Sequence, residues 1–288
     1  MKAHQYPAIT LVTPSFNQGS FLEETIRSIV SQGYPNLEYF VVDGGSTDNS
    51  VDIIRKYSSD ITWWVSEKDR GQTDALIKGF SRASGDVLGW INSDDLLEPN
   101  ALAAVGQAWS NAPGSLIAGK VRLFSSSRGR DQLLCPRNLN FENMVRIWKR
   151  KSFFSQPGVF FPRQEYVQAG GLDVNLPYCM DYDLIIRLSR ICPVIYFDLV
   201  LARARQHPAS KTCSQSGNQV VESCAVARRY LAELVGPNTL TARWQLKAYT
   251  ARRVLGRVYH GAPSAVLPLL RELVWPLEIP RGAAGVKS

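Results

Sequence analysis

Two adjacent carboxylates, Asp94 and Asp95, follow the short apolar run Val87 to Ile91 near the middle of the first half of the chain. The run has the length and composition of a buried strand, and it ends abruptly in Asn92-Ser93-Asp94-Asp95. Neighbouring carboxylates repel each other unless a cation lies beside them. Because Mg²⁺ and related ions take carboxylate and phosphate oxygens together, this pattern predicts a cation-and-phosphate site. The alternative is a polar turn that caps the next helix.

Four other polar clusters also interrupt apolar stretches. Three of them follow predicted strands: Pro14 to Asn17, Asp43 to Asp48, and Asp69 to Gly71. The fourth, Asp181-Tyr182-Asp183, opens a predicted helix much later in the chain. In open α/β sheets, ligands bind at the carboxyl ends of parallel strands. We therefore expect the strand-end clusters to meet at one edge of a sheet.

The elements that must position these clusters alternate between strand and helix. Apolar strand-like runs lie at 9–12, 37–42, 61–65 and 87–91, with helical apolar spacing between them. This alternation predicts parallel strands joined by right-handed crossovers. Thr73 stands where it could cap the helix predicted to run to Ala83. A last strand of the body is expected at 194–200, and helices after about residue 206.

Composition is that of an ordinary soluble protein of one large or two modest domains: 288 residues, 45% hydrophobic and 20% charged. The net charge of +8 is unevenly distributed. From residue 201 onward there are 13 Lys and Arg against 4 Asp and Glu, which gives +9. The remaining 20 basic and 21 acidic residues give −1, so the body is neutral and the tail is basic.

The five cysteines form no C-x-x-C pair, and their irregular spacing favours free thiols in a reducing compartment. No signal peptide and no transmembrane run is visible, so we expect a cytoplasmic protein. The tail adds a stripe at helical spacing, flanked by basic residues: Trp244, Ala248, Ala251, Leu255 and Val258. This stripe either packs on the body or lies on the anionic inner face of the cell membrane.

Six strings together give the chain a family resemblance: TPSFNQ, VVDGGSTDNS, EKDRGQTDA, GWINSDD, AGGLD and MDYDLIIRL. In this order and spacing, the chain resembles the family 2 glycosyltransferases of the GT-A fold from about residue 8 to 205. The resemblance implies an α/β fold with a Rossmann-like, mostly parallel central sheet and flanking helices. It implies a catalytic domain at 1–205, with a nucleotide-sugar half at 1–95 and an acceptor half at 96–205. Residues 206–288 would form a helical extension.

The resemblance also implies residue roles. The residues implied to bind the donor, a nucleotide-diphosphate sugar, are Thr13, Pro14, Ser15, Asn17, Asp43, Asp69, Arg70, Asn92, Ser93 and Asp94. The residues implied to bind Mg²⁺ or Mn²⁺ are Asp94, Asp95 and, as weaker matches, His207 with Lys211 nearby. Asp181 matches the catalytic base of inverting members. The residues placed toward a saccharide or lipid-linked acceptor are Gln156, Met180 and Asp183.

The chemistry independently requires these residue types. A nucleotide-sugar donor leaves as a charged diphosphate, which a metal ion neutralises. An acceptor hydroxyl is a poor nucleophile, so a carboxylate must take its proton during attack. A single carboxylate base implies one displacement with inversion, unlike the paired carboxylates of glycoside hydrolases. Sugar transfer in polysaccharide or glycolipid synthesis is the function expected.

Two departures from the family pattern leave alternatives open. Asn92 replaces the usual first aspartate of the D-x-D signature, and Met180 replaces a glutamate that commonly precedes the base. A nucleotide-sugar-binding protein that lost catalysis, or a nucleotidyltransferase, are the alternative readings. A Rossmann oxidoreductase would need G-x-G-x-x-G after the first strand, which is absent. Nucleic acid is not an expected partner, because the aromatic residues of the tail lie on the apolar stripe.

Overall fold

We describe a computed structural model of the chain at residues 6–125, 131–208, 210, 216–234 and 239–259. The first four strands are parallel and lie in the order β3-β2-β1-β4. Their bounds are β1 Ile9–Ser15, β2 Leu37–Asp43, β3 Trp63–Ser66 and β4 Val87–Trp90. The helices between them are α1 Gly19–Val30, α2 Ser50–Lys56 and α3 Gln72–Phe80. The predicted strand–helix alternation is therefore confirmed.

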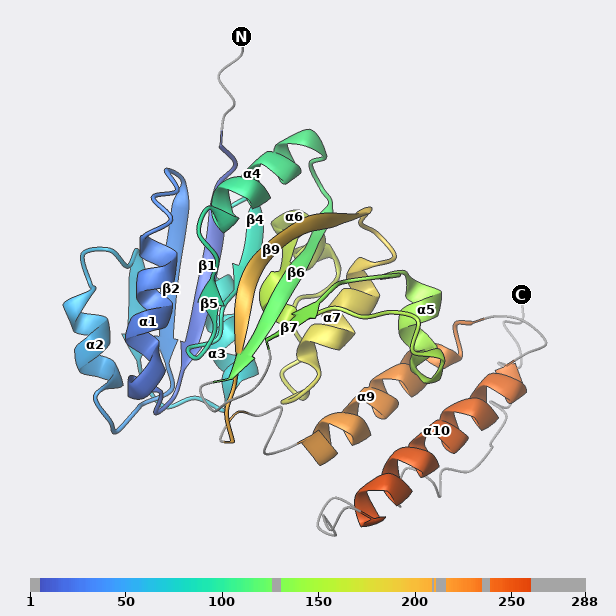
Figure 1. Ribbon diagram of the computed structural model, residues 1–288. Helices are drawn as coiled ribbons and strands as arrows, with labels where there is room; N and C mark the ends of the chain where they lie inside the picture. Colours follow the sequence, from blue (N-terminus) through green and yellow to red (C-terminus); the bar gives the residue numbers. More distant parts are fainter. Residues whose placement is uncertain (1–5, 126–130, 209, 211–215, 235–238, 260–288) are drawn as a thin grey trace, which may run out of the picture.

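The second half of the sheet is mixed rather than parallel. In the described part of the chain, the sheet continues from β4 in the order β8-β6-β9-β5, and β7 pairs with β6. Only the β6–β9 pair is parallel in this half. The bounds are β5 Leu96–Leu97, β6 Leu116–Ser125, β7 Gln132–Leu134, β8 Val159–Pro162 and β9 Val194–Gln206. Figure 1 shows β6 and β9 running together across the middle of the molecule.

Helices cover both faces of this sheet. Those of the second half are α4 Ala101–Asn111, α5 Phe141–Val145, α6 Arg163–Gln168, α7 Met180–Leu188, α9 Ser216–Leu231 and α10 Thr239–Tyr259. Short 3-10 turns lie at Ile147–Lys149 and Gln156–Gly158. Neighbouring residues of a strand point to opposite faces of the sheet, so β1 contributes to two hydrophobic clusters. Leu11 belongs to the cluster on one face and Val12 to the cluster on the other.

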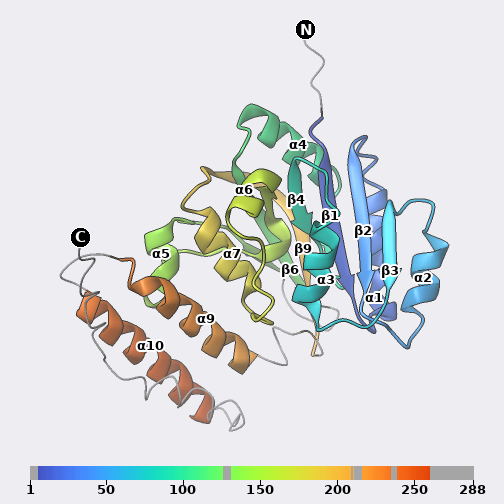
Figure 2. The ribbon, with the colours of Figure 1, turned by 180° about the vertical axis from the view of Figure 1, so that it is seen from behind.

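The carboxyl-terminal helices pack on the body. Val220 and Ala227 of α9, and Leu246 of α10, belong to the same hydrophobic cluster as Leu184 of α7. Figure 2 shows α9 and α10 side by side, beyond α5 and α7. One face of α9 is therefore buried against the body of the protein, at residues 1–205. The extension and the body thus share a core.

One expectation from the sequence was wrong: the last strand of the body continues past residue 200 to Gln206, where it still pairs with β6. The stripe on α10, whose placement was left open between the body and a membrane, is exposed at Trp244 (60%), whereas Ala242, Leu246 and Thr250 on the same helix are buried. The side chains of Leu255 and Val258 lie outside the described residues.

The four cysteines that the structure describes are free thiols, as expected, and Cys213 lies outside the described residues. Within the described part of the chain, no helix is both long and apolar enough to cross a membrane.

Candidate active site

The strands β1, β2 and β4 end at one edge of the sheet, where the turns carrying the predicted donor-binding residues begin (Figure 1). The last residue pair between β1 and β2 is Ser15 and Asp43, so the two following turns begin side by side. Ile91, which follows β4, donates its N–H to the carbonyl of Val12 at 3.1 Å. The turn that carries Asn92 is thus held next to the turn after β1. Parallel pairing alone produces this convergence.

Asp43 shapes the loop after β2. Its carboxylate is fully buried and accepts hydrogen bonds from the N–H groups of Gly45 (3.1 Å) and Ser46 (2.9 Å). It also accepts from the hydroxyls of Ser46 (2.5 Å) and Ser66 (2.7 Å). These four bonds fill the usual capacity of a carboxylate. The predicted contact of Asp43 with the donor's base or ribose stays a prediction.

The turn after β1 is bonded to the loop after β2. Asn17 has a left-handed backbone with φ of 51°. Its side-chain oxygen accepts from Thr47 N–H at 2.8 Å, and its own N–H donates to the Ser46 hydroxyl at 2.7 Å. Thr13 is buried and accepts from the Tyr39 hydroxyl at 3.2 Å, so its side chain supports the strand. Contacts of 13–17 with a donor would come mainly through the backbone.

Phe16 is a residue at this edge that the sequence reasoning did not single out. Its side chain is 58% exposed, although it sits between the buried Ser15 and the bonded Asn17. An exposed aromatic ring offers a face on which a nucleotide base can stack. The signal that could have found it is its place inside the string TPSFNQ, where an apolar residue interrupts a polar turn.

The loop after β3 is folded against its neighbours. Asp69 accepts from Gly71 N–H at 2.7 Å, and the Arg70 guanidinium donates to Asp74 at 2.8 Å. The side chain of Arg70 is otherwise exposed, at 73%. A Cβ at Gly44 would lie 2.8 Å from an oxygen of Asp69. Glycine at position 44 therefore lets the loops after β2 and β3 meet, and puts Asp69 beside the Asp43 loop.

Asp94 and His207 form the contact that best matches a cation site. Asp94 Oδ2 and His207 Nε2 are 3.0 Å apart, although 113 positions separate the residues. The imidazole is 8% exposed and its ring packs on Phe21, with 4.7 Å between ring centroids. The structure thus brings together the predicted ligand Asp94 and the more weakly predicted His207. Lys211 lies outside the described residues.

Asp95 points away from this pair. It is 5% exposed, and its two oxygens accept from the backbone N–H of Arg205 at 2.9 Å and the Asn92 amide at 3.1 Å. Burial, and next the charge of Asp94, raises the pKa of Asp95 to about 8. The prediction that Asp95 also binds the metal is therefore not supported: its oxygens fasten the end of β9 to the turn after β4.

Asn92 belongs to a chain of side-chain amides. Its oxygen accepts from Gln72 at 2.6 Å, and its NH₂ also lies 3.4 Å from the Gln156 oxygen. Gln156 in turn donates to the carbonyl of Trp90 at 2.9 Å. This chain places Gln156, predicted on the acceptor side, next to the predicted donor side. Ser93 is buried, and its carbonyl accepts from Thr25 at 3.0 Å.

Asp181 is the second residue of α7 and is partly exposed. One carboxylate oxygen accepts the N–H of Tyr182 at 2.7 Å. Burial raises the pKa of Asp181 to about 6, and the charge of Glu222 adds to the increase, while backbone N–H groups oppose it. A carboxylate with that pKa is ionised at neutral pH and is a stronger base than an ordinary aspartate. These properties suit the predicted role of Asp181.

Asp183, which was predicted to lie toward an acceptor, has a side chain that is only 1% exposed. Its Oδ2 accepts from Arg187 at 2.6 Å, and its Oδ1 accepts from the Tyr230 hydroxyl at 2.7 Å and from Arg229 at 3.2 Å. A buried carboxylate needs such partners, so Asp183 is a structural ion that joins α7 to α9. Met180 is also buried, in the core cluster around α7, so the acceptor contact predicted for it is not supported either.

A hydrogen bond links the donor side to the approach of α7. Thr73, at the start of α3, donates its hydroxyl to the carbonyl of Leu176 at 2.8 Å. Thr73 was expected to cap α3, but Gly71 occupies the cap position and the threonine is buried. Because Gln72 contacts Asn92, two consecutive residues of α3 join the turn after β4 to the loop before Asp181.

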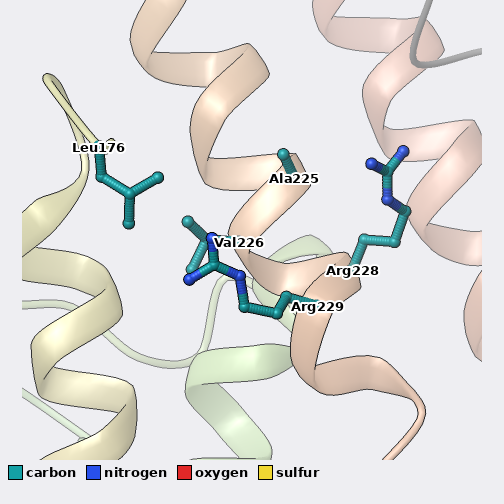
Figure 3. Close-up of a pocket in the computed structure, with 5 residues that line it drawn as sticks. All are labelled: Leu176, Ala225, Val226, Arg228 and Arg229. Atoms are coloured by element: carbon teal, nitrogen blue, oxygen red, sulfur yellow. The ribbon is translucent and has the colours of Figure 1, made fainter. Parts of the chain in front are cut away.

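A hollow of about 370 Å³ lies on a different surface, along α9 (Figure 3). It is lined by Leu176, Ala225, Val226, Arg228 and Arg229. None of the predicted site residues lines it.

The Asp94–His207 pair fits a divalent cation that shares its coordination with a phosphate. A carboxylate oxygen and an imidazole nitrogen, already in contact, are ligand types that Mn²⁺ accepts. Among the described residues, no group of three or more His, Cys, Asp and Glu could hold an ion by itself. Mg²⁺ sites often have few protein ligands, because substrate phosphates supply the others.

Comparisons with known sequences match this chain to glycosyltransferases. The family model described as Glycosyl transferase family 2 matches residues 10–170. An uncharacterized glycosyltransferase of Rickettsia typhi is 26% identical over 243 residues, which cover 81% of this chain and 75% of the relative. One from Mycobacterium tuberculosis is 28% identical, covering 68% and 74%. Three other Rickettsia glycosyltransferases are longer, and the match spans 34%, 34% and 30% of their lengths.

Solved structures share the fold at low identity. The mannosyltransferase PcManGT from Pyrobaculum calidifontis, in complex with GDP-Man and Mn²⁺, has a TM-score of 0.62 at 19% identity, covering 96% of this chain and 89% of that one. S. aureus TarS 1–349 in complex with UDP-GlcNAc has a TM-score of 0.58 at 13% identity, covering 92% and 90%. These likenesses show the GT-A architecture.

Proposed function

This chain belongs to glycosyltransferase family 2, and we propose that it moves a sugar from a nucleotide-diphosphate donor to a hydroxyl acceptor with inversion at the anomeric carbon. The observation that carries the proposal is the position of Asp181. It is the partly exposed carboxylate at the start of α7, and its pKa of about 6 makes it a base at neutral pH. The Gln72–Thr73 contacts connect its helix to the turn that carries Asp94.

The proposed reaction needs one proton transfer by the protein. Asp181 takes the proton of the acceptor hydroxyl as its oxygen attacks the anomeric carbon. The bond between that carbon and the donor's diphosphate oxygen breaks, and the diphosphate leaves with the bonding electrons. Attack from the side opposite the leaving group inverts the anomeric centre. No second nucleophilic carboxylate is required for this single displacement.

The donor is proposed to lie along the turns after β1, β2 and β4. Phe16 offers a stacking face for the base, and the 13–17 backbone borders the same edge. Asp94 and His207 would hold Mg²⁺ or Mn²⁺, which neutralises charge on the leaving diphosphate. Among the solved structures of the same fold, PcManGT contains GDP-Man with Mn²⁺ and TarS contains UDP-GlcNAc.

An anionic membrane surface is proposed as a partner of α10. Trp244 is 60% exposed, and Arg252 and Arg253 are exposed on the same helix. Exposed tryptophan beside basic residues suits the interface of a bilayer with anionic lipids. A lipid-linked acceptor would then be within reach, in polysaccharide or glycolipid synthesis. TuaG of Bacillus subtilis, named as a putative teichuronic acid biosynthesis glycosyltransferase, is 37% identical over 51 residues, 18% of this chain.

The test is Asp181→Asn, assayed against a panel of nucleotide sugars with Mn²⁺. The amide can still accept the Tyr182 N–H but cannot take a proton. We expect transfer to fall by about 10²–10⁴-fold, the range for loss of a general base, with donor affinity within about twofold of the wild type. Product analysis by NMR of the anomeric proton reports inversion. Full turnover by the variant would refute the assignment of the base.

A further inference from the structure

Glu222 of α9 caps the helix that carries Asp181. Its Oε1 accepts the backbone N–H of Tyr178 at 2.9 Å and that of Cys179 at 2.7 Å. Cys179 is the N-cap residue of α7, so its N–H is among those that no earlier turn of the helix can satisfy, and Tyr178 directly precedes it. Glu222 lies 44 positions after Tyr178 and 43 positions after Cys179 in the chain. Cys179, the N-cap residue, makes no side-chain hydrogen bond that caps α7.

A second contact fixes α9 against the same turn. Tyr230 and Arg229 bond to Asp183, which is two residues after Asp181. Seven residues separate Glu222 from Arg229, about two helical turns, so both lie on one face of α9. Arg229 also bonds to Asp173 in the loop before α7, at 3.0 Å. The first turn of α7 is therefore held by α9 on both sides of Asp181.

Glu222 also places a negative charge near Asp181. Its charge adds to the effect of burial in raising the pKa of Asp181, because like charges disfavour ionisation of a neighbour. Burial, and next the charges of Asp181 and Glu222, also raise the pKa of the Cys179 thiol before α7 above its ordinary value, so the thiol is neutral.

We propose that Glu222 is a positioning residue of the transfer reaction: through its bonds to the backbone of Tyr178 and Cys179 it fixes the turn that carries Asp181. This inference rests on the proposed role of Asp181 as the base. The helical extension is then part of the catalytic site. The charge of Glu222 makes Asp181 a stronger base, and the bonds of Glu222 to Tyr178 and Cys179 fix the orientation of the turn that carries Asp181.

Glu222→Gln separates the charge from the cap. The amide oxygen can accept the same two N–H groups, but the negative charge is lost. We expect the acidic limb of kcat/KM, which reports the base of the free enzyme, to move to lower pH. Glu233→Gln is the matched control. It also removes a carboxylate from the carboxyl-terminal part of the chain, but this carboxylate pairs with Arg190 at the surface. Its pH profile should equal that of the wild type.

Glu222→Ala removes both effects. Two N–H groups lose their acceptor, so the first turn of α7 can shift. We expect kcat to fall by at least about tenfold, because small displacements of a catalytic group are costly, while donor KM stays within about twofold. Glu222→Gln should recover most of that loss. If Glu222→Ala does not fold, the pH profile of Glu222→Gln decides alone.

The outcomes separate this inference from the proposed function. If Asp181→Asn transfers sugar at the wild-type rate, the base assignment fails whatever Glu222 does. If Asp181→Asn is inactive but Glu222→Gln has the same pH profile as Glu233→Gln, the inference about Glu222 alone is overturned. A wild-type kcat in Glu222→Ala would also overturn it.

Discussion

The donor edge and the first turn of α7 are built in different ways. At the donor edge, Asp43 bonds to Gly45 and Ser46, two and three residues away. At α7, the partners are distant: Glu222 for Cys179 and Tyr230 for Asp183. The stretch that the family model matches ends at residue 170, before α7 begins. The loop that Asp43 shapes thus depends largely on local sequence, unlike the distant Asp94–His207 contact, whereas the turn of the proposed base depends on a helix outside the matched stretch.

The largest effect expected is on stability at the distant contacts. Asp183→Ala should destabilise the protein by about 3–5 kcal/mol, because it leaves Arg187 and Arg229 without a buried partner. Chemical denaturation with urea measures the loss. Arg190→Ala is the control, since its exposed pair with Glu233 should contribute about 1 kcal/mol or less. Similar losses in the two variants would remove the contrast between α7 and the surface.

A donor-edge variant should change binding instead of stability. Asp94→Ala should weaken Mn²⁺-dependent donor binding by about 100-fold or more, because it removes the carboxylate whose charge favours the cation. Isothermal titration with and without EDTA measures this. Asp60→Ala, at an exposed position, is the control. Equal donor affinity with and without chelator in the wild type would refute a metal role.

The third prediction uses the pKa of Asp181. Because its folded-state pKa is raised to about 6, folding favours the protonated form, and that stability is lost as pH rises through 6. Asp181→Asn removes the penalty. We expect the variant to be more stable than the wild type by up to about 2 kcal/mol at pH 8, with no difference at pH 4. Urea titrations at both pH values test this, and a pH-independent difference would contradict it.

The smallest effect is expected at the membrane face. Trp244→Ala should reduce binding to vesicles containing anionic lipid by about fivefold, roughly 1 kcal/mol, because one interfacial ring is lost. Val167→Ala, at a side chain that is 66% exposed on α6, is the control. Co-sedimentation at low and high salt measures binding. No wild-type binding at low salt would end the membrane proposal.

The comparison also explains how far sequence reasoning reached. Strand–helix alternation was enough to place Asp43 and Asn92 at one edge, because parallel pairing fixes which ends meet. It could not show that Asp95 turns inward, since that depends on the backbone N–H of Arg205, 110 positions later. Sequence reasoning also left open which face of α10 is exposed. Helical spacing shows that a stripe exists, but the contacts made by Ala242 and Leu246 decide which face is buried.

The Glu222 cap has a consequence for the order in which the protein is made. Ribosomes release the chain from its amino end, and the earliest segments fold first. β1 to β4 and the bonded turns between them are all encoded before residue 95. The amino end of α7 gains its acceptor only after residue 222 has emerged. A nascent chain therefore acquires the turns proposed to border the nucleotide before it acquires His207 of the proposed metal pair, and both before it acquires a fixed base.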